Sequence, residues 1–308
     1  MSLFFNKSGE ARFLLFVGES CPSNCFLCNN RNLRKKYYPY DNLKNNILFL
    51  KKKVDKNSEL MLFYTDAVFH PNIEDFIQDE TLNSFKMFTL QTHPIYFPEY
   101  WKRVNFIVNK NKNILFHVCN FYLNENNFDN IKYYTQEIIF LNWRFDIDFY
   151  FDFLKYKNLL KEYLAILPWK ISYRYLNWKI RAIKLEYKNV EVTLYYQGEQ
   201  VILEDKKYIT NVYYTQCISE SSFVVKNDKI WILEEVAFLP NGDITFHRNT
   251  LCSKSLKKIS SVKKNNSEIV KDFLKLKEYL SKFNNWEPMG YNCYQCIVNE
   301  YDVDKIEI

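Results

Sequence analysis

Short, uninterrupted apolar runs constrain the fold of this chain more than any other feature of its sequence. Continuous runs of this kind are typical of strands buried on both faces, as in a parallel sheet that is covered by helices. They recur through the first half of the chain, mostly with helix-compatible stretches between them, at 13–17, 60–64, 85–90, 104–108, 114–118 and 138–141. The fourth and fifth runs are too close for an intervening helix, so one of them is expected to be a helix end or an extra strand.

The pattern changes in the second half of the chain. Residues 149–167 are expected to be helical and to end at Pro168. Alternating segments then predict a mostly antiparallel sheet with strands at 170–175, 190–196, 208–214, 223–225 and 230–238. Asn241-Gly242 is expected to form a hairpin turn. A last helix is expected to bury one apolar face made of Ile269, Phe273, Leu276, Leu280 and Phe283.

These patterns predict an α/β protein with two parts. Residues 1–170 would form the parallel core, with a boundary that lies between 170 and about 200, and residues 171–308 would form a smaller β-rich α+β region. No apolar run reaches the roughly 18 residues of a membrane span, and Glu10 and Arg12 interrupt any signal region. A soluble, cytoplasmic protein without a membrane partner is therefore expected. The net charge of +6 comes from Lys-rich stretches that are expected to be solvated surface.

Three cysteines close to the amino terminus carry the strongest chemical signal. Cys21, Cys25 and Cys28 have the spacing C-x3-C-x2-C and follow the first apolar run. Eight cysteines in a reduced compartment are better metal ligands than disulfide partners. Three thiolates on one loop can hold a four-iron cubane and leave one iron without a protein ligand. The alternative is a zinc site that takes its fourth ligand from elsewhere.

This spacing, in a loop after the first strand of an α/β sheet, resembles the radical S-adenosylmethionine superfamily. The resemblance implies a partial (β/α)6 TIM-like barrel, and a 4Fe-4S cluster whose open iron binds S-adenosyl-L-methionine and cleaves it reductively to a 5′-deoxyadenosyl radical. It also implies a reducing partner such as flavodoxin or ferredoxin. Leu27 stands where the family usually has an aromatic residue, which Phe26 supplies one place earlier.

The resemblance places the cofactor at the carboxyl ends of the strands, where polar residues become candidates for binding it. Each of these residues could instead cap a helix or satisfy loop backbone. The candidates are Asp66, Gln91, Thr92, Asn120 and Asn142.

A second group of cysteines follows in the last third of the chain. Cys217, a Gly-containing hairpin, Cys252 and the C-x2-C pair Cys293 and Cys296 occur in an order that resembles the twitch and SPASM extensions of peptide-modifying radical enzymes. The resemblance implies an auxiliary 4Fe-4S cluster on these four cysteines, with Cys119 as the reserve ligand. A zinc site or inert buried thiols are the alternatives.

Three functions follow from these features. The leading hypothesis is radical modification of a peptide or protein substrate, and the second is the same chemistry on a small metabolite, sugar or nucleotide. The third is a zinc protein that binds nucleic acid through its lysine patches and aromatic residues, although nucleic acid is not the expected partner. No general acid or base is nominated, and the four histidines are expected to be structural.

Overall fold

The protein has a mixed α/β fold built on one large and one small sheet. The computed structural model describes residues 2–7, 11–18, 37–63, 66–92, 98–111, 113–123, 128–140, 143–151, 153–176, 179–196, 222–233, 235–246 and 258–281.

The large sheet contains eleven strands. They are β2 (Arg12–Phe16), β3 (Glu59–Phe63), β4 (Met87–Thr92), β5 (Ile114–Leu123), β6 (Phe145–Phe151), β7 (Lys170–Leu176), β8 (Lys179–Tyr187), β9 (Val190–Tyr196), β12 (Val236–Phe238), β13 (Asp243–Phe246) and β14 (Ser260–Ser261). Their order is β14-β13-β12-β2-β3-β4-β5-β6-β9-β8-β7. The pairs from β12 to β9 in this order are parallel, and the pairs at the two ends are antiparallel.

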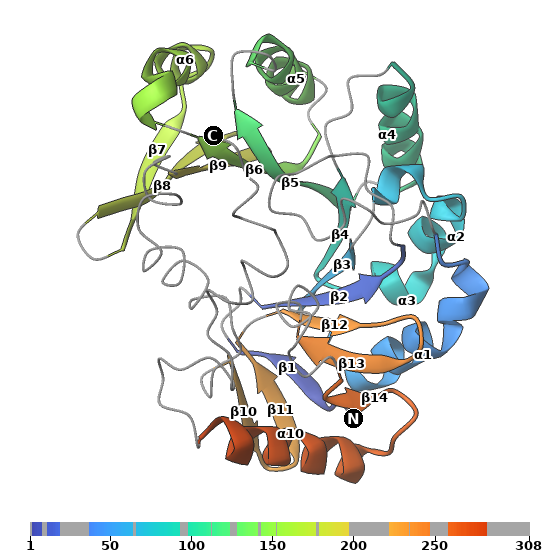
Figure 1. Ribbon diagram of the computed structural model, residues 1–308. Helices are drawn as coiled ribbons and strands as arrows, with labels where there is room; N and C mark the ends of the chain where they lie inside the picture. Colours follow the sequence, from blue (N-terminus) through green and yellow to red (C-terminus); the bar gives the residue numbers. More distant parts are fainter. Residues whose placement is uncertain are drawn as a thin grey trace, which may run out of the picture.

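Helices cover one side of this sheet, which bends into an arc with the helices outside (Figure 1). They are α1 (Lys44–Lys53), α2 (Ile73–Gln78), α3 (Glu80–Asn83), α4 (Pro98–Lys110), α5 (Phe128–Phe140) and α6 (Phe153–Ala165), with the short 3-10 helices η1 (Tyr40–Leu43) and η2 (Ala67–Phe69). The chain alternates between strand and helix from β2 to α6, as a parallel sheet requires.

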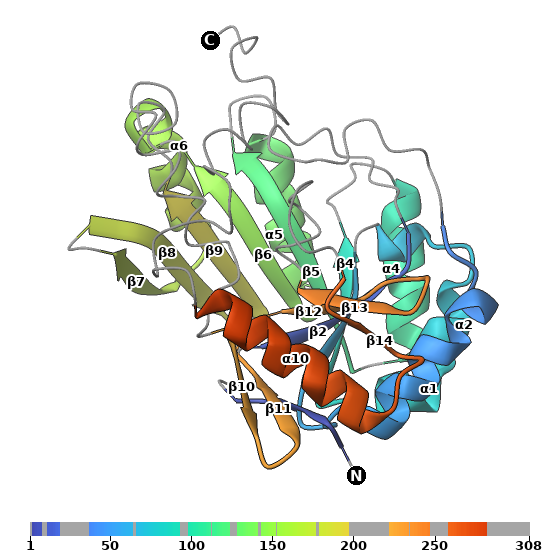
Figure 2. The same ribbon diagram turned by 60° about the horizontal axis from the view of Figure 1, so that its bottom comes forward.

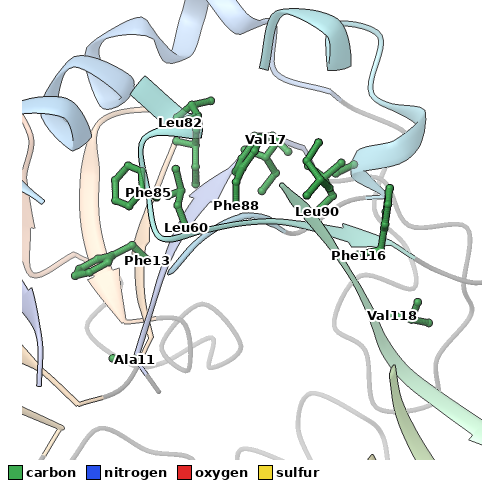
Figure 3. Close-up of a cluster of buried hydrophobic side chains, with 14 of the residues drawn as sticks. Ala11, Phe13, Val17, Leu60, Leu82, Phe85, Phe88, Leu90, Phe116 and Val118 are labelled. Atoms are coloured by element: carbon green, nitrogen blue, oxygen red, sulfur yellow. The ribbon is translucent and has the colours of Figure 1, made fainter. Parts of the chain in front are cut away.

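Alternate residues of each parallel strand form the core beneath these helices. Phe13 pairs in register with Leu60, and Leu60 pairs with Phe88, so the three side chains lie in one row. Figure 3 shows Val17, Phe88 and Leu90 pointing from the sheet toward the helical layer. All of these side chains are buried. Burial of each one stabilises the fold by about 1.5–3 kcal/mol, which explains why the apolar runs become central strands.

The carboxyl-terminal third of the chain returns to the first strands. β1 (Phe4–Asn6) pairs in parallel with β11 (Lys229–Ile232), which pairs antiparallel with β10 (Phe223–Lys226) to form the small sheet. Helix α10 (Asn266–Leu280) runs across this region and contacts β10, β11 and β14 (Figure 2). Its expected apolar face is confirmed for Ile269, Phe273, Leu276 and Leu280, which are buried, whereas Phe283 lies outside the described residues.

The expected hairpin turn at Asn241-Gly242 is confirmed between β12 and β13. Gly242 has a φ of +88°, a conformation that L side chains rarely adopt, and its amide donates to the Leu239 carbonyl at 2.8 Å. The Gly242 carbonyl accepts from the Val262 amide at 2.8 Å, which ties the turn to the chain beside β14.

Several expected elements differ in the structure. The run at 138–141 was expected to be a strand, but residues up to 140 belong to α5, because Ile131, Thr135 and Ile138 continue a buried helical stripe. Residues 149–151 belong to strand β6 rather than to the following helix. The run at 104–108 is helical and the one at 114–118 is a strand, which resolves that alternative.

Further along the chain, the segment expected as one strand at 230–238 is divided between β11 and β12, and the strand expected at 208–214 lies outside the described residues. Strands on both sides of residue 170 share the large sheet, and the division into functional regions at that point remains a prediction. Among the described helices, none combines the length and apolar character needed to cross a membrane.

Candidate functional site

The structure describes only some of the predicted site residues. Asp66, Gln91 and Thr92 lie in described segments, and Asn120 lies on β5 next to Cys119. The remaining candidates lie outside the described residues, namely Cys21, Cys25, Cys28, Asn142, Cys217, Cys252, Cys293 and Cys296. Within the described part of the chain, no group of three or more His, Cys, Asp or Glu side chains could hold a metal ion. The predicted cluster ligands therefore remain predictions.

The two ends of the segment that carries Cys21, Cys25 and Cys28 meet at the carboxyl end of β2. Gly18 and Tyr37 form an antiparallel bridge, and the Tyr38 amide donates to the Val17 carbonyl at 2.9 Å. The Val17 amide in turn donates to the Phe63 carbonyl at 3.2 Å, so this stem is continuous with β3. Gly18 and Tyr37, the described residues on either side of residues 19–36, therefore lie together at the carboxyl end of β2, where parallel α/β folds place their sites.

A buried histidine supports this stem. The Nε2 atom of His70 lies 3.2 Å from the Tyr38 carbonyl oxygen, and its Nδ1 accepts from the Asn72 amide at 3.0 Å. The edge of the Tyr37 ring meets the His70 ring at a centroid distance of 5.0 Å. Burial lowers the pKa of His70, against the smaller opposing effects of the Tyr38 and Val17 carbonyls and Asp75. The neutral ring, with its proton on Nε2, satisfies both hydrogen bonds.

Asp66 and Thr92 come together at the carboxyl ends of β3 and β4. The Oδ1 atom of Asp66 accepts from the Val68 amide at 3.1 Å and from the Thr92 hydroxyl at 3.0 Å. Asp66 thereby caps η2, which is the structural alternative for this residue. The Thr92 hydroxyl also lies 3.4 Å from the Tyr100 hydroxyl of α4. Both Asp66 and Thr92 are buried, so the pair joins two neighbouring strand ends.

Gln91 belongs to the opposite face of the sheet. Side chains alternate along a strand, so Thr89 and Gln91 face away from the helices while Phe88, Leu90 and Thr92 face toward them. Gln91 pairs in register with His117 of β5, and His117 pairs with Asp146 of β6. A row of polar residues therefore crosses the face that the helices leave uncovered.

Sequence reasoning did not predict the ionic network that occupies this face. Arg12 at the start of β2 donates from Nε to Glu59 Oε2 at 3.0 Å and from Nη2 to Asp146 Oδ2 at 3.3 Å. Its Nη1 lies 4.0 Å from Glu235 Oε1. The Nδ1 atom of His117 lies 3.0 Å from Asp146 Oδ2.

The contact between Arg12 and Asp146 shows that the sheet is curved. Strands β2 and β6 are four steps apart in the strand order, which corresponds to about 19 Å in a flat sheet. An arginine side chain alone does not bridge that distance, so the 3.3 Å contact requires a strong bend toward this face. The network therefore lies on the concave side of the sheet, opposite the helices of Figure 1.

The network raises the pKa of Arg12 and lowers the pKa of Asp146. Burial disfavours the charge on Arg12, but Glu59, Glu235 and Asp146 outweigh it and raise the pKa of the guanidinium. Burial also opposes the charge on Asp146, but the hydrogen bond and charge of His117, together with Arg12, lower the pKa of its carboxyl. Asp146 is consequently ionised at neutral pH and fixes the orientation of the His117 ring.

A sequence signal for this network exists in retrospect. Each contributing strand contains a charged or ionisable residue within an otherwise mostly apolar segment: RFLLF in β2, ELMLF in β3, ILFHV in β5 and FDIDF in β6. Strands buried on both faces by apolar layers would exclude such residues. They indicate that one face of the sheet is polar.

Comparison with known proteins identifies structural neighbours only. No protein-family model matches the chain, and no curated protein matches its sequence. The solved structure of native anSMEcpe with bound AdoMet and the Cp18Cys peptide aligns over 94% of this chain and 87% of that one, with a TM-score of 0.50 and 9% identity. SuiB of Streptococcus suis, bound to S-adenosylmethionine, aligns over 82% of this chain with a TM-score of 0.41 and 11% identity. This chain spans 64% of the length of SuiB. At such identities the likeness to anSMEcpe concerns the fold.

Proposed function

We propose that this protein is a radical S-adenosylmethionine enzyme that modifies a peptide or protein substrate. The observation that carries the proposal is the C-x3-C-x2-C triplet on a segment whose two ends are hydrogen-bonded together at the carboxyl end of β2. A fold shared with an enzyme solved with AdoMet and a peptide supports it.

The donor set suits an iron-sulfur cluster. Cys21, Cys25 and Cys28 supply three thiolates within eight residues of sequence, which fits three corners of a cubane. When bound, such a cluster supplies the electron that cleaves S-adenosylmethionine to a 5′-deoxyadenosyl radical. An electron donor such as flavodoxin or ferredoxin belongs to the same proposal, as does a cytoplasmic location, where thiols stay reduced.

The proposal gives the curved sheet the role of a partial barrel that encloses the cofactor and the substrate. Gln91 and Asn120 belong to neighbouring central strands, and we assign both to the cofactor pocket together with Asn142. Asp66 and Thr92 join the ends of β3 and β4, so their role in binding would be to shape the pocket wall as well as to contact the cofactor.

A second metal site is proposed on Cys217, Cys252, Cys293 and Cys296. Cys217 precedes Phe223 by six positions, and Cys252 follows Phe246 by six positions. The rings of Phe223 and Phe246 pack with centroids 5.7 Å apart, so the two described chain ends nearest these cysteines lie together. This convergence supports a shared auxiliary 4Fe-4S cluster, with Cys119 of β5 as the reserve ligand.

Anaerobic reconstitution with iron and sulfide tests the proposal. We expect a brown protein with roughly seven to eight irons if both cubanes form, and 5′-deoxyadenosine after reduction with S-adenosylmethionine. Cys21→Ala should abolish cofactor cleavage, whereas Cys293→Ala should remove about half of the iron and leave that cleavage in place. One or two equivalents of zinc without iron would refute the proposal and favour a zinc protein.

The substrate class has a separate test. Synthetic peptides encoded by short neighbouring reading frames should be modified, and mass spectrometry would detect the change. Modification of a metabolite, sugar or nucleotide in place of any peptide would retain the enzyme class and refute the peptide assignment.

A further inference from the structure

His70 occupies a position between three parts of the chain. It follows η2 directly, its ring is fully buried, and the rings of Tyr37 and Phe76 meet it edge-on at centroid distances of 5.0 Å each. Phe76 belongs to α2, whereas Tyr37 is the residue at which the chain returns from residues 19–36. The imidazole therefore connects the helical layer to the stem of that segment.

The hydrogen bonds of His70 have a direction that matters. The Asn72 amide donates to Nδ1, which leaves Nε2 as the protonated nitrogen and hence as the donor to the Tyr38 carbonyl. Tyr38 then donates its own amide to the Val17 carbonyl at 2.9 Å. A continuous series of hydrogen bonds thus runs from Asn72, directly before α2, through His70 and Tyr38 to Val17, directly after β2.

The stem includes one bridge, between Gly18 and Tyr37, and the hydrogen bond from the Tyr38 amide to the Val17 carbonyl. Short backbone contacts of this kind are marginal without support from a packed neighbour. His70 supplies that support from within the core, where competition from water is absent.

We propose that His70 is a positioning residue that holds the two ends of the 19–36 segment together, so that Cys21, Cys25 and Cys28 remain arranged around one cluster. The inference rests on the proposed function for the cluster itself. The imidazole acts through the backbone of Tyr38 and Val17. Loss of the Nε2–H donor would weaken the stem. Cluster binding would then have to restrict a chain with more conformational freedom, which costs more entropy.

Three variants test the role of His70. His70→Gln can still offer an amide N–H to the Tyr38 carbonyl, whereas His70→Leu fills the space without a donor. Phe76→Leu is the matched control, because it alters a ring that packs against His70 and leaves the hydrogen bond from His70 to Tyr38 intact. Each full-length protein is reconstituted with iron and sulfide, and the loss of cluster absorbance to a chelator is followed together with the melting temperature.

We expect His70→Leu to lose the cluster of Cys21, Cys25 and Cys28 about tenfold faster than the natural protein, the effect of one lost hydrogen bond. His70→Gln should restore most of the lifetime of the iron-sulfur cluster. Phe76→Leu should lower the melting temperature without shortening the cluster lifetime. Equal cluster lifetimes in His70→Leu and Phe76→Leu would overturn the inference, because the effect would then be general destabilisation.

Hydrogen exchange of the metal-free protein separates this inference from the proposed function. The Tyr38 amide should exchange about tenfold faster in His70→Leu than in the natural protein and in Phe76→Leu. If the natural protein binds no iron, the proposed function fails, and the inferred cluster-positioning role fails with it even where the exchange result stands. If the protein binds iron and Tyr38 exchange is unchanged in His70→Leu, the positioning role fails alone.

Discussion

Replacement of Arg12 by methionine would remove the only cation that contacts Glu59, Asp146 and Glu235 together among the described residues. The guanidinium lies 3.0 Å from Glu59, 3.3 Å from Asp146 and 4.0 Å from Glu235, and its side chain is 24% exposed. Removal of one partner from a buried ion pair costs about 3–5 kcal/mol, because the remaining charge has no compensation. Partial exposure places the expected loss at the lower end, about 3 kcal/mol in the free energy of unfolding.

The pH dependence of this loss distinguishes electrostatics from packing. Asp146 has a lowered pKa in the folded protein, so its contribution to stability is present above the pKa of the unfolded chain and is lost as the pH falls through the folded value. Without Arg12, the Asp146 carboxyl binds a proton more readily. The difference between Arg12→Met and the natural protein should therefore be largest near pH 7 and should shrink toward pH 4.

Urea unfolding at several pH values measures both quantities. Lys44→Met is the matched control, because Lys44 contacts Asp41 at 2.7 Å but both side chains are mostly exposed, and such pairs contribute less than about 1 kcal/mol. The double variant Arg12→Met with Asp146→Asn should recover part of the lost stability. A loss below about 1 kcal/mol, or one that is constant with pH, would refute the view that the concave face holds a coupled ionic network.

Three further predictions concern the remaining parts of the fold and can be measured by urea or thermal unfolding. Phe273→Ala should cost about 3–5 kcal/mol in the free energy of unfolding, because this buried ring packs against Phe4 and other core aromatic rings. Leu274→Ala is the control, because this neighbouring side chain is 48% exposed and its loss should cost less than about 1 kcal/mol. Similar costs for the two variants would contradict the placement of α10. Gly242→Ala should destabilise by about 1–2 kcal/mol because of the positive φ and a Cβ only 3.1 Å from Val262 Cγ2, and a neutral effect would show that the turn relaxes. Asp66→Asn retains an oxygen for the Val68 amide and should cost no more than about 1 kcal/mol, while Asp66→Ala should cost about 1–2 kcal/mol; equal losses would argue against the capping role.

The sequence alone predicted the central strands well, because burial dominates there. The runs at 13–17, 60–64 and 85–90 overlap β2, β3 and β4 closely, and the alternating segments at 170–175 and 190–196 correspond to β7 and β9. The run at 138–141 failed, because four apolar residues at the end of a helical stripe look the same as a short buried strand.

The network around Arg12 was beyond sequence reasoning for a different reason. Arg12 and Asp146 are separated by 134 positions, and their contact depends on the curvature of five strands. Local patterns do not report the accumulated bend of a sheet. The same holds for His70, which lies beside Tyr38 although 32 positions separate the two residues. The predicted cysteine ligands rest on their spacing and their position in the sequence, and they remain predictions.

The placement of β12 beside β2 has a consequence for biosynthesis. β2 pairs with β3 on one edge and with residues 236–238 on the other, and β1 pairs with residues 230–232. The amino-terminal strands thus have an incomplete neighbour until most of the polypeptide has left the ribosome. We expect folding to finish after translation, with the slow kinetics of a topology rich in distant pairings.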